Sequence, residues 1–419
     1  MKVLIVNKFL YPNGGSETYI FEIGKQLHKM GHEVQYFGME HENRIVENSA
    51  NSYTSNMDFH TGKLAKLMYP FKIIYSREAR KKIRVVLDDF KPDVVHLNNI
   101  NFQITPSILY EIKKYQKDTG NKVKIVATAH DYQWICPNHM LYIPHREEIC
   151  ERCTGGAFGN CAKYKCIHGS FVKSVLGSVE SYFYHLRKTY GLIDVVICPS
   201  EFMKQQLAKD KVLAKKLVVM RNFVTVTGGD SENVETNDGA NGWKPNNADT
   251  LSNEKDNYVL YFGRFAKEKG IETLLKVCEQ LPDIPVVFAG SGPLEDTVNS
   301  IKRIENAGFK KGDELRELIA KARFSIYPSE WYENCPFSIM ESQMYGTPVI
   351  GADIGGIPEL IQEGKNGELF ESCNAEDLKE KIQLLWKDRD RLQLYTENCT
   401  KIQYDTVEMY CEKLLEEYN

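Results

Sequence analysis

Short runs of apolar, mostly β-branched residues alternate along the chain with longer stretches in which apolar residues recur every three or four positions. The first pattern is typical of strands buried on both faces, and the second of amphipathic helices. In the first half the expected strands are Val3–Asn7, Val34–Phe37, Val94–Leu97, Ile125–Ala129, Val195–Pro199 and Leu217–Met220. In the second half they are Tyr258–Phe262, Val286–Ala289, Phe324–Tyr327, Val349–Ala352 and Glu368–Phe370. Such alternation predicts an α/β fold of two doubly wound, Rossmann-like domains.

A polar segment rich in Gly, Asn, Asp, Ser and Thr separates the two halves. Because it has few apolar residues to bury, we expect a linker over residues 223–257. The N-terminal domain is then 1–222 and the C-terminal domain begins at 258. Ligands of doubly wound sheets bind at the carboxyl ends of the strands, so we expect the site in a cleft that the two domains face.

Composition narrows the class of protein. Of the 419 residues, 42% are hydrophobic and 26% are charged, close to globular averages, which excludes a disordered chain, a collagen-like repeat and a coiled coil. The net charge of −4 combines an excess of 11 positive charges in residues 1–222 with an excess of 15 negative charges in the rest. A basic half indicates an anionic partner or membrane surface there, and the alternative is unrelated drift in the surface charge of two domains.

The hydrophobic runs are too short to form a secretory signal peptide or a membrane-spanning helix. Only four apolar residues, Val3 to Val6, follow Met1-Lys2, which is less than a signal-peptide core needs. No run reaches the roughly 18 apolar residues of a spanning helix. We therefore expect a cytoplasmic protein whose contact with a membrane, if any, is peripheral, and whose 11 cysteines are reduced thiols or metal ligands.

Two loops of the second half carry candidate chemistry. The strand ending at Phe262 runs into Gly263 and Arg264, with Lys269 five residues further on. The glycine allows a sharp turn, and the two cations suit phosphate oxygens. The alternative is a solvated charge run at a helix start.

The strand ending at Tyr327 is followed by a second candidate loop. Pro336 is well placed as the first residue of a helix, so the N–H groups of Phe337 and Ser338 form a ready anion site. Glu333 precedes this helix and can accept hydrogen bonds from sugar hydroxyls. Glu341 lies inside the helix, where it can bind a second diol such as a ribose.

At this point the sequence resembles the retaining GT-B glycosyltransferases of glycosyltransferase family 4. The resemblance covers most of 258–370 and rests on segments in matching order. These are Gly263-Arg264 with Lys269-Gly270, Ala289-Gly290-Ser291-Gly292-Pro293, Tyr327-Pro328-Ser329, Glu333 and Glu341, Gly346-Thr347-Pro348-Val349-Ile350, and Gly355-Gly356-Ile357-Pro358-Glu359. Residues 301–311 depart from the pattern, which there has a strand ending in glycine close to the base of the donor; Gly308 is the candidate counterpart.

The resemblance implies roles for these residues. Arg264 and Lys269 would hold the diphosphate of a nucleotide-sugar donor, Glu333 the hydroxyls of its sugar, and Glu341 the ribose. It also implies that residues 401–419 cross back to the N-terminal domain, so that the donor domain is 258–400.

In the first half, Gly14 and Gly15 stand between the first expected strand and a helix. In the resembled family this loop closes over the donor diphosphate. His130 and Asp131 follow the strand that ends at Ala129, and a family histidine of this kind contacts the donor sugar near the reaction centre. The alternative for His130 is a structural histidine at a strand end. Asp131 is expected either to orient His130 or to bind hydroxyls of the acceptor.

The resemblance implies retention of the anomeric configuration, with a phosphate oxygen taking the proton of the acceptor hydroxyl. Positioning and charge stabilisation would then be the work of the protein. Asp388-Arg389-Asp390 has the Asp-x-Asp spacing of metal-dependent transferases, but it lies in a charged helical run, so we expect no catalytic metal.

A cluster of cysteines marks an insertion at about 136–168. Cys150 and Cys153 have the two-residue gap of zinc knuckles, and Cys161 and Cys166 could complete a tetrahedral thiolate site. The loop Thr154–Asn160 between these pairs is Gly-rich and has little core of its own, and a structural zinc would explain how such an insertion holds its shape. Free thiols are the alternative.

Residues 60–84 combine lysines and arginines with aliphatic and aromatic side chains, as membrane-surface segments do. The alternative is an ordinary helix with its apolar face in the core. No nucleic-acid recognition motif accompanies the charge, so nucleic acid is not expected as a partner.

We therefore expect a transferase that moves a sugar from a nucleotide-sugar onto a glycan or lipid-linked acceptor in surface polysaccharide biosynthesis. One alternative is a nucleotide-sugar epimerase of the same fold. Another is a non-catalytic, zinc-containing glycan-binding protein.

Overall fold

The computed structural model describes residues 1–56, 73–224, 255 and 257–419, and it divides into two compact units. Unit 1 is Met1–Arg221 together with Val407–Asn419, and unit 2 is Asn222–Thr406. Most of the expected linker lies outside the described residues, as do Lys63, Lys66 and Lys72 of the basic stretch.

Unit 1 is built on a parallel six-stranded sheet in the order β2-β1-β3-β4-β7-β8. Its strands are β1 (Lys2–Val6), β2 (Glu33–Phe37), β3 (Val94–Leu97), β4 (Lys124–Thr128), β7 (Val195–Cys198) and β8 (Leu217–Val219). Its helices are α1 (Gly15–Lys29), α3 (Arg77–Phe90), α4 (Ile108–Thr119), α5 (Gly159–Tyr164), α6 (Phe171–Leu186), α7 (Glu201–Leu207) and α14 (Val407–Tyr418). The central strands are almost wholly buried because helices cover both faces of a parallel sheet.

Unit 2 repeats this architecture with the order β11-β10-β9-β12-β13-β14. Its strands are β9 (Val259–Phe262), β10 (Val286–Ala289), β11 (Ile304–Gly308), β12 (Phe324–Tyr327), β13 (Val349–Ala352) and β14 (Gly367–Phe370). Its helices are α8 (Ile271–Gln280), α9 (Glu295–Ser300), α10 (Gly312–Lys321), α11 (Phe337–Met344), α12 (Ala375–Lys387) and α13 (Arg389–Cys399). The core between sheet and helices includes Phe265, Phe288 and Phe324.

The strand orders confirm two doubly wound α/β domains. Each expected strand is present within one or two residues of its predicted ends. The structure adds β11, which was not predicted as a strand. It ends at Gly308, and the pattern of the resembled family also has a strand ending in glycine here. It is an edge strand with half-buried side chains, so its polar sequence lacks the apolar run of the central strands.

The cysteine-rich insertion has a small core of its own. Its hairpin of β5 (Tyr142–Ile143) and β6 (Glu148–Ile149) and the helix α5 enclose Cys150, Cys153, Cys161 and Cys166, with Ile143 and Phe158 between them. In the loop 154–160, Phe158 is the one buried residue, so most of this small core is made by the buried thiols themselves.

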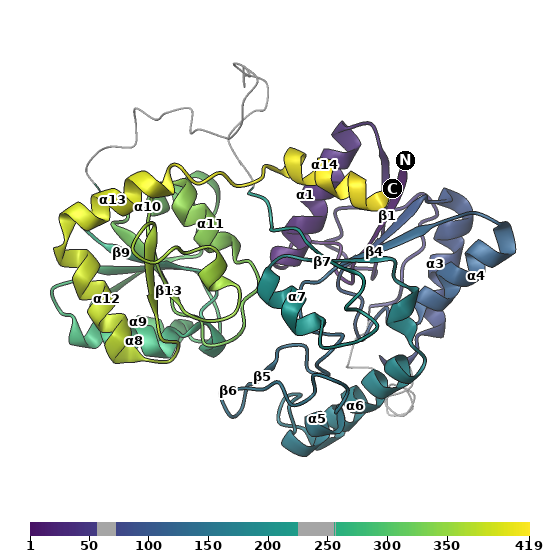
Figure 1. The fold of residues 1–419 in the computed structure, drawn as a ribbon, viewed down its shortest axis with the longest axis horizontal. Helices are drawn as coiled ribbons and strands as arrows, with labels where there is room; N and C mark the ends of the chain where they lie inside the picture. The colour runs from purple at the N-terminus through teal and green to yellow at the C-terminus, as the bar shows by residue number, and fades with distance from the viewer. Residues whose placement is uncertain (57–72, 225–254, 256) are drawn as a thin grey trace. The chain divides into compact units, whose positions relative to one another are not determined.

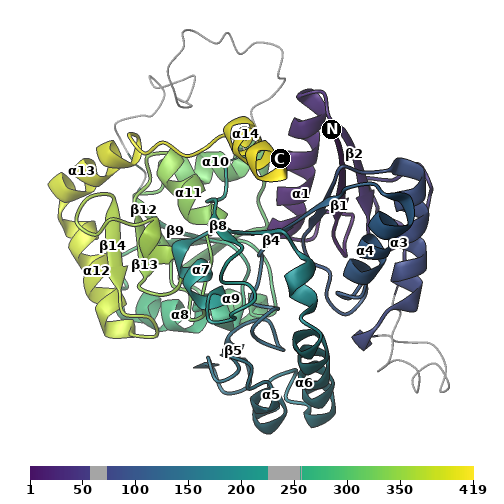
Figure 2. The same cartoon turned by 45° about the vertical axis from the view of Figure 1, so that its right-hand side comes forward.

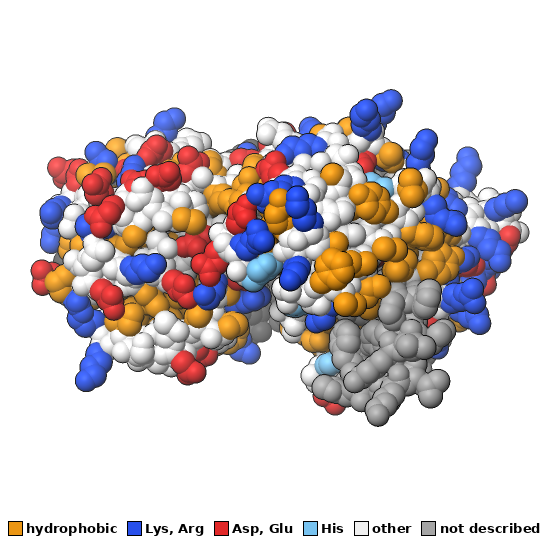
Figure 3. All heavy atoms as spheres, turned by 90° about the horizontal axis from the view of Figure 1, so that it is seen from below, with side chains coloured by type: hydrophobic (Ala, Val, Ile, Leu, Met, Phe, Trp, Pro, Cys, Tyr) orange, Lys and Arg blue, Asp and Glu red, His pale blue; other side chains and the backbone are white. Residues whose placement is uncertain are grey.

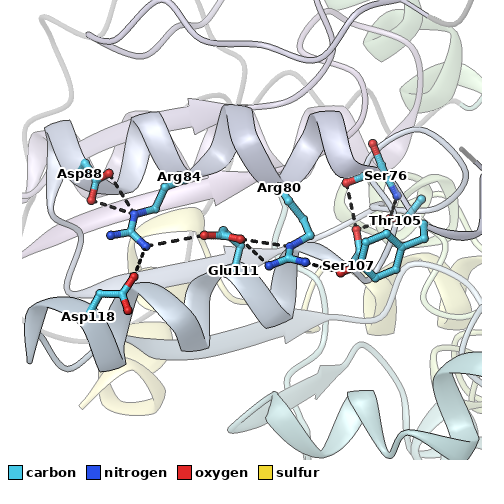
Figure 4. A network of polar contacts seen from close by, with 9 residues as sticks. Ser76, Arg80, Arg84, Asp88, Thr105, Ser107, Glu111 and Asp118 are labelled. Carbon is cyan, nitrogen blue, oxygen red and sulfur yellow. Dashed lines mark hydrogen bonds and ion pairs between the residues drawn. The ribbon is translucent and has the colours of Figure 1, made fainter.

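A charged network joins α3 to α4 (Figure 4). Arg80 Nη2 lies 2.6 Å from Glu111 Oε2, and Arg84 Nη1 lies 2.7 Å from Asp118 Oδ2. Arg84 also donates to Asp88 within α3 at 2.9 Å. These two arginines belong to the basic stretch at 60–84, and their charges are matched by carboxylates of the protein itself.

The last helix, α14, packs on the first, α1, within unit 1 (Figures 1 and 2). Its inward face buries Tyr410, Cys411, Leu414 and Tyr418. Across the described residues, each helix is too short or too polar to cross a membrane.

Candidate functional site

In unit 2 the strand order reverses between β9 and β12. The chain proceeds from β9 outward to β10 and β11, then returns to the other side of β9 with β12. The carboxyl ends of two such strands open into a crevice, which is the usual ligand position in a doubly wound sheet. The loops at this point are 263–270, after β9, and 328–336, after β12, so both predicted loops of this domain meet here.

A glycine lets these loops approach closely. Gly270 has φ +70°, and a Cβ built on it would lie 1.7 Å from the carbonyl oxygen of Pro328. Glu330 N donates to Glu268 O at 2.9 Å across the same contact. The backbone thereby fixes the position of Lys269, which directly precedes Gly270.

Lys269 and Glu333 form an ion pair between the two loops. Lys269 Nζ lies 2.5 Å from Glu333 Oε1, although 64 residues separate them. The ammonium group also lies 5.3 Å from the centre of the Trp331 ring, where a cation is attracted by the π-face. The sequence predicted both residues as site residues, and the structure brings them into contact.

Glu333 is held as a carboxylate. Its Oε1 accepts hydrogen bonds from Ser329 Oγ at 2.8 Å and Trp331 Nε1 at 2.6 Å in addition to the bond from Lys269. Burial opposes ionisation of this side chain, but the charge of Lys269 and the three hydrogen bonds outweigh burial and lower the pKa of Glu333. An acceptor-only group therefore occupies the crevice at neutral pH.

Two glycines behind the crevice fix the backbone of Glu333. Gly356 N donates to Glu333 O at 2.7 Å, and a Cβ on Gly355, at φ +61°, would lie 2.5 Å from the same oxygen. The Gly355-Gly356 segment of the motif is thus explained by close packing against the loop that carries Glu333.

Arg264 lies on the open side of the same loop. Its side chain is 63% exposed, and its Nη2 donates to Glu268 Oε1 at 3.1 Å. Gly263 precedes it with φ +147° and donates its N–H to Ala289 O at 3.0 Å. The guanidinium group is therefore accessible to an anion, at the end of β9.

The predicted helix start after β12 is present as α11, with one correction. Pro336 is the residue before the first helical turn and has an extended backbone, so it caps the helix, whereas the sequence analysis placed it as the first helical residue. Phe337 and Ser338 are then the first two helical residues, whose N–H groups have no partner within an α-helix. Glu341, one turn further on, is half-buried, and burial raises its pKa.

In unit 1 the strand order reverses between β1 and β3, and asparagines stand at both strand ends. Asn7 Oδ1 accepts from Asn99 N at 3.0 Å, and Asn7 Nδ2 donates to Glu17 Oε1 at 2.9 Å. Gly14 and Gly15 are exposed at the start of α1, above this network. The backbone of Gly14 is extended, with φ −179°, and a Cβ built on it would lie 3.5 Å from Glu17 Oε2, an ordinary contact, so neither strain nor close packing requires a glycine here.

His130 follows β4 and is held by Asn98, at the end of β3. His130 Nε2 lies 2.8 Å from Asn98 Oδ1, and the Tyr19 ring packs on the imidazole with centroids 5.1 Å apart. Burial lowers the pKa of His130 to about 4, so the ring is neutral at pH 7.

Asp131 has different partners from those expected. Its Oδ1 accepts from Gln133 N at 2.9 Å, and its Oδ2 lies 3.7 Å from His139 Nδ1. Asn98 hydrogen-bonds to His130, so it occupies an orienting position of the kind that was one of the two roles expected of Asp131.

The four predicted zinc ligands lie in one buried cluster as free thiols. Cys161 and Cys166 share a thiol–thiol hydrogen bond, which favours the thiolate of Cys166 and lowers its pKa. Arg152 Nη1 lies 3.3 Å from Cys150 Sγ. In the part of the chain that the structure describes, no three His, Cys, Asp or Glu side chains are arranged as a metal site.

Comparison with known proteins identifies the two units. Residues 13–227 match the family "Glycosyltransferase Family 4", and residues 244–402 match "Glycosyl transferases group 1". The first match alone covers about half of the chain, and the two together include both crevices.

Individual relatives agree with these matches. The chain is 30% identical over 224 residues, 52% of its length, to an uncharacterized glycosyltransferase of Methanocaldococcus jannaschii, and the match spans 56% of that protein. It is 28% identical over 140 residues, 30% of its length, to a putative colanic acid biosynthesis glycosyltransferase of Salmonella typhimurium, of which the match spans 34%.

Among solved structures, Anabaena HepE in complex with UDP-glucose superposes with a TM-score of 0.61 at 16% identity, over 99% of both chains. At this identity the likeness is evidence for the fold, which is that of the GT-B glycosyltransferases.

Proposed function

Because the chain belongs to Glycosyltransferase Family 4, we propose that it moves a sugar from a nucleotide-sugar donor onto a glycan or lipid-linked acceptor, with retention of configuration at the anomeric carbon. The name of the Salmonella typhimurium relative supports a place in polysaccharide biosynthesis, and the UDP-glucose bound to HepE supports a nucleotide-sugar donor. The family match favours a transferase over the epimerase and over the non-catalytic glycan-binding protein.

One observation carries the proposal: Lys269 and the carboxylate of Glu333 meet at the switch point of unit 2, with Arg264 on the same loop. A diphosphate needs cations, and a sugar needs hydrogen-bond acceptors for its hydroxyls. The crevice supplies a cation in Lys269 and a hydrogen-bond acceptor in Glu333, which form one ion pair. The start of α11 adds backbone N–H groups that can bind an anion.

In the proposed reaction the bond between the anomeric carbon and the phosphate oxygen breaks, and a bond from that carbon to the acceptor oxygen forms on the same face. The proton of the acceptor hydroxyl passes to a phosphate oxygen, and the nucleoside diphosphate leaves. Arg264 and Lys269 stabilise the negative charge that develops on the leaving group. Glu333, being ionised, accepts hydrogen bonds from the donor sugar and does not act as the proton donor.

The remaining predicted residues have proposed roles that come from the family resemblance. Glu341 binds the ribose, and Gly14 and Gly15 admit the diphosphate close to the backbone of unit 1. His130 contacts the donor sugar, and Asp131 stands on the acceptor side. We expect no catalytic metal in this reaction, because the two cations of the loop after β9 provide the charge.

The test measures donor turnover by Lys269→Ala beside a matched control. Lys267→Ala removes the same charge from the same short helical turn, but Lys267 pairs with Glu272 at 3.3 Å on the surface. Loss of Lys269 is expected to lower turnover about 100-fold, the scale of losing one charge-stabilising group, and loss of Lys267 about twofold or less. Equal activity of the Lys269→Ala variant and the wild type contradicts the proposal.

Zinc at Cys150, Cys153, Cys161 and Cys166 remains a proposal. Its support is the gathering of four buried thiols in one small core, where neighbouring arginines favour a thiolate. Binding requires the thiols to lose protons and turn toward a common centre about 2.3 Å from each sulfur. Protein purified without chelator should contain about one equivalent of zinc, and less than half an equivalent in the folded protein argues against the site.

Contact with an anionic membrane surface is proposed for unit 1. The side of the molecule that carries α5 and α6 exposes hydrophobic side chains among basic ones (Figure 3). Exposed residues of α6 include Val172 and Leu186, at 68% and 81%, and Arg187 and Lys188 follow it. Sedimentation with anionic vesicles at low salt tests this, and Leu186→Glu should weaken the binding; no binding by the wild type contradicts it.

A further inference from the structure

Trp331 contacts both members of the Lys269–Glu333 ion pair. Its Nε1 donates to Glu333 Oε1 at 2.6 Å, and the Lys269 ammonium group lies 5.3 Å from the centre of its ring. An indole N–H can only donate, and the ionised carboxylate is a strong acceptor for it. Trp331 therefore stabilises the anion through the edge of its ring and the cation through the π-face.

The Lys269 ammonium group faces two anions under the proposed function. It lies 2.5 Å from Glu333 Oε1, and it is also one of the two cations that would bind the donor diphosphate. A diphosphate close to this pair adds negative charge, and negative charge disfavours ionisation of a neighbouring carboxylate. Lys269 alone would therefore hold Glu333 least firmly when the donor is bound and the carboxylate is needed.

Two neutral groups also donate to Glu333 Oε1. The Ser329 hydroxyl donates at 2.8 Å, but the carbonyl oxygen of Glu268 lies 3.3 Å from the same Oγ and can accept the same single proton. The N–H of Trp331 has a fixed direction in the plane of a half-buried ring, and Glu333 Oε1 is its partner. Trp331 is therefore the neutral donor that is best fixed on this carboxylate.

The titratable side chains around this crevice come from β9, from the loop after β9 and from the end of β12. They are Tyr261, Glu268, Lys269 and Tyr327. Burial raises the pKa of both tyrosines above the usual value, so both hydroxyls are neutral at pH 7. Glu268 pairs with Arg264 at 3.1 Å. Among these groups Lys269 therefore supplies the charge that favours the carboxylate of Glu333, and hydrogen bonds supply the rest.

We propose that Trp331 is a positioning residue that holds Glu333 ionised and in place while the Lys269 ammonium group binds the donor diphosphate. The carboxylate then stays available to hydroxyl groups of the ligand, and the cation stabilises the leaving group. The part of the ligand rests on the proposed function, whereas the bond from Trp331 to Glu333 is a property of unit 2 alone.

The first experiment needs no activity. The pKa of Glu333 is measured by ¹³C NMR titration of the glutamate carboxyl groups in the full chain, with Glu333→Gln to assign the signal, in the absence and presence of UDP. Trp331→Phe keeps an aromatic face for Lys269 and removes the N–H. With UDP bound, the pKa of Glu333 should be about one pH unit higher in this variant than in the wild type. Equal values with UDP bound, or a difference that does not grow when UDP binds, overturn the proposal.

The matched control is Trp386→Phe, which removes an indole N–H from α12 of the same unit, where the Trp386 ring lies over Arg323 at 4.1 Å. It should leave the pKa of Glu333 unchanged, and a rise as large as that in Trp331→Phe contradicts a specific role for Trp331. Ser329→Ala leaves the indole in place, so Glu333 should stay ionised with UDP bound. An effect equal to that of Trp331→Phe overturns the assignment to the indole.

A measurement on the wild type keeps the test valid if Trp331→Phe does not fold. The chain has four tryptophans, and the indole proton signal that Glu333→Gln displaces belongs to Trp331. This signal should lie downfield, as a hydrogen bond to a carboxylate requires, and should keep its position when UDP is added. An upfield shift on addition of UDP shows that the bond breaks when the diphosphate binds, which overturns the proposal.

The second experiment measures turnover of UDP-glucose against pH, with other nucleotide-sugars if this one is not a substrate. The acid limb of kcat reports groups of the enzyme–substrate complex. In Trp331→Phe it should move up by about one pH unit, with a smaller loss of activity at pH 8. A loss that is equal at every pH indicates a merely structural role and overturns the proposal. If the wild type binds no nucleoside diphosphate and turns over no nucleotide-sugar, the proposed function fails, and the spectra without ligand still decide whether Trp331 holds Glu333.

Discussion

The hydroxyl group of Tyr410, in α14, lies 3.0 Å from the hydroxyl group of Tyr19, in α1, although 391 residues separate them in the chain. Tyr19 OH also contacts Thr128 Oγ1, which lies 2.7 Å from His96 Nε2, and His96 Nδ1 lies 2.7 Å from Tyr418 OH. The hydrogen-bond network thus begins at Tyr410 and ends at Tyr418, and both tyrosines belong to α14. Since every member is buried, the last helix is joined by polar contacts to the strands beneath His130.

The first prediction concerns the tyrosine pair. Tyr410→Phe and Tyr19→Phe should each lower the free energy of unfolding of unit 1 by about 1 kcal/mol, the usual net value of a buried hydrogen bond. The double variant should lose clearly less than the sum, because both single variants remove the same contact. Urea unfolding followed by tyrosine fluorescence and circular dichroism measures these losses.

The control for this cycle is Tyr404→Phe in unit 2, whose hydroxyl bonds to Gln343. Tyr404 and Tyr19 belong to different compact units, so their effects should add. If the effects of Tyr19→Phe and Tyr410→Phe are equally additive, the contact between the two hydroxyl groups does not contribute to stability.

The second prediction concerns the pH dependence of the Lys269–Glu333 pair. The pKa of Glu333 is lowered in the folded state, so the carboxylate stabilises the fold above the unfolded pKa of about 4.3, and this contribution is lost as the pH falls through the folded value. Glu333→Gln should therefore cost about 2 kcal/mol at pH 7, and progressively less as the pH falls from the unfolded pKa through the folded pKa. Unfolding curves of both proteins across this range give the difference, which must shrink on acidification; a constant difference refutes the role of charge.

The third prediction concerns His130. Burial lowers its pKa to about 4, whereas an unfolded histidine titrates near 6.5. Between these values unfolding takes up one proton at this ring, so stability falls by about 1.4 kcal/mol per pH unit as the pH decreases. His130→Gln should lose less stability than the wild type between pH 7 and pH 5. Parallel stability profiles of the two proteins would show that His130 does not titrate in this way.

The fourth prediction separates close packing from backbone strain at Gly270. Gly270 and Gly364 have nearly the same φ, +70° and +75°, but a Cβ on Gly270 would overlap Pro328 O, while the space around Gly364 is open. Gly364→Ala should cost about 1 kcal/mol for the left-handed backbone alone. Gly270→Ala should cost more than twice as much and also lower donor turnover, because Lys269 moves with it. Thermal unfolding and turnover of both variants check this, and equal effects of the two substitutions contradict a role for close approach.

Much of the fold could be predicted because buried parallel strands have an unbroken apolar sequence. The strands β3, β10, β12 and β13 begin and end where the apolar pattern placed them. The edge strand β11 was not predicted because its residues are half-buried or exposed, so it lacks an apolar run. The hairpin of β5 and β6 was not predicted because strands of two residues show no detectable period.

At the site, the sequence pointed to residues but not to their partners. Lys269 and Glu333 were each predicted from a strand end, but their contact depends on β12 lying beside β9, which the order of strands along the chain does not reveal. Asn98 is the clearest omission, since a polar residue after a buried strand was the available signal. Its importance depends on the neighbouring strand that carries His130, and that adjacency is again a property of the sheet.

The membership of α14 in unit 1 has a consequence for how the protein is made. A ribosome completes residues 222–406, and with them the whole of unit 2, before it synthesises Tyr410 and Tyr418. Domains usually fold as units in the order of their synthesis. Unit 1 can complete its packing only after unit 2 has been synthesised, because the helix that packs on α1 follows unit 2 in the chain. While unit 2 is being translated, nascent unit 1 therefore lacks α14. We expect unit 1 to depend most on a chaperone during this interval.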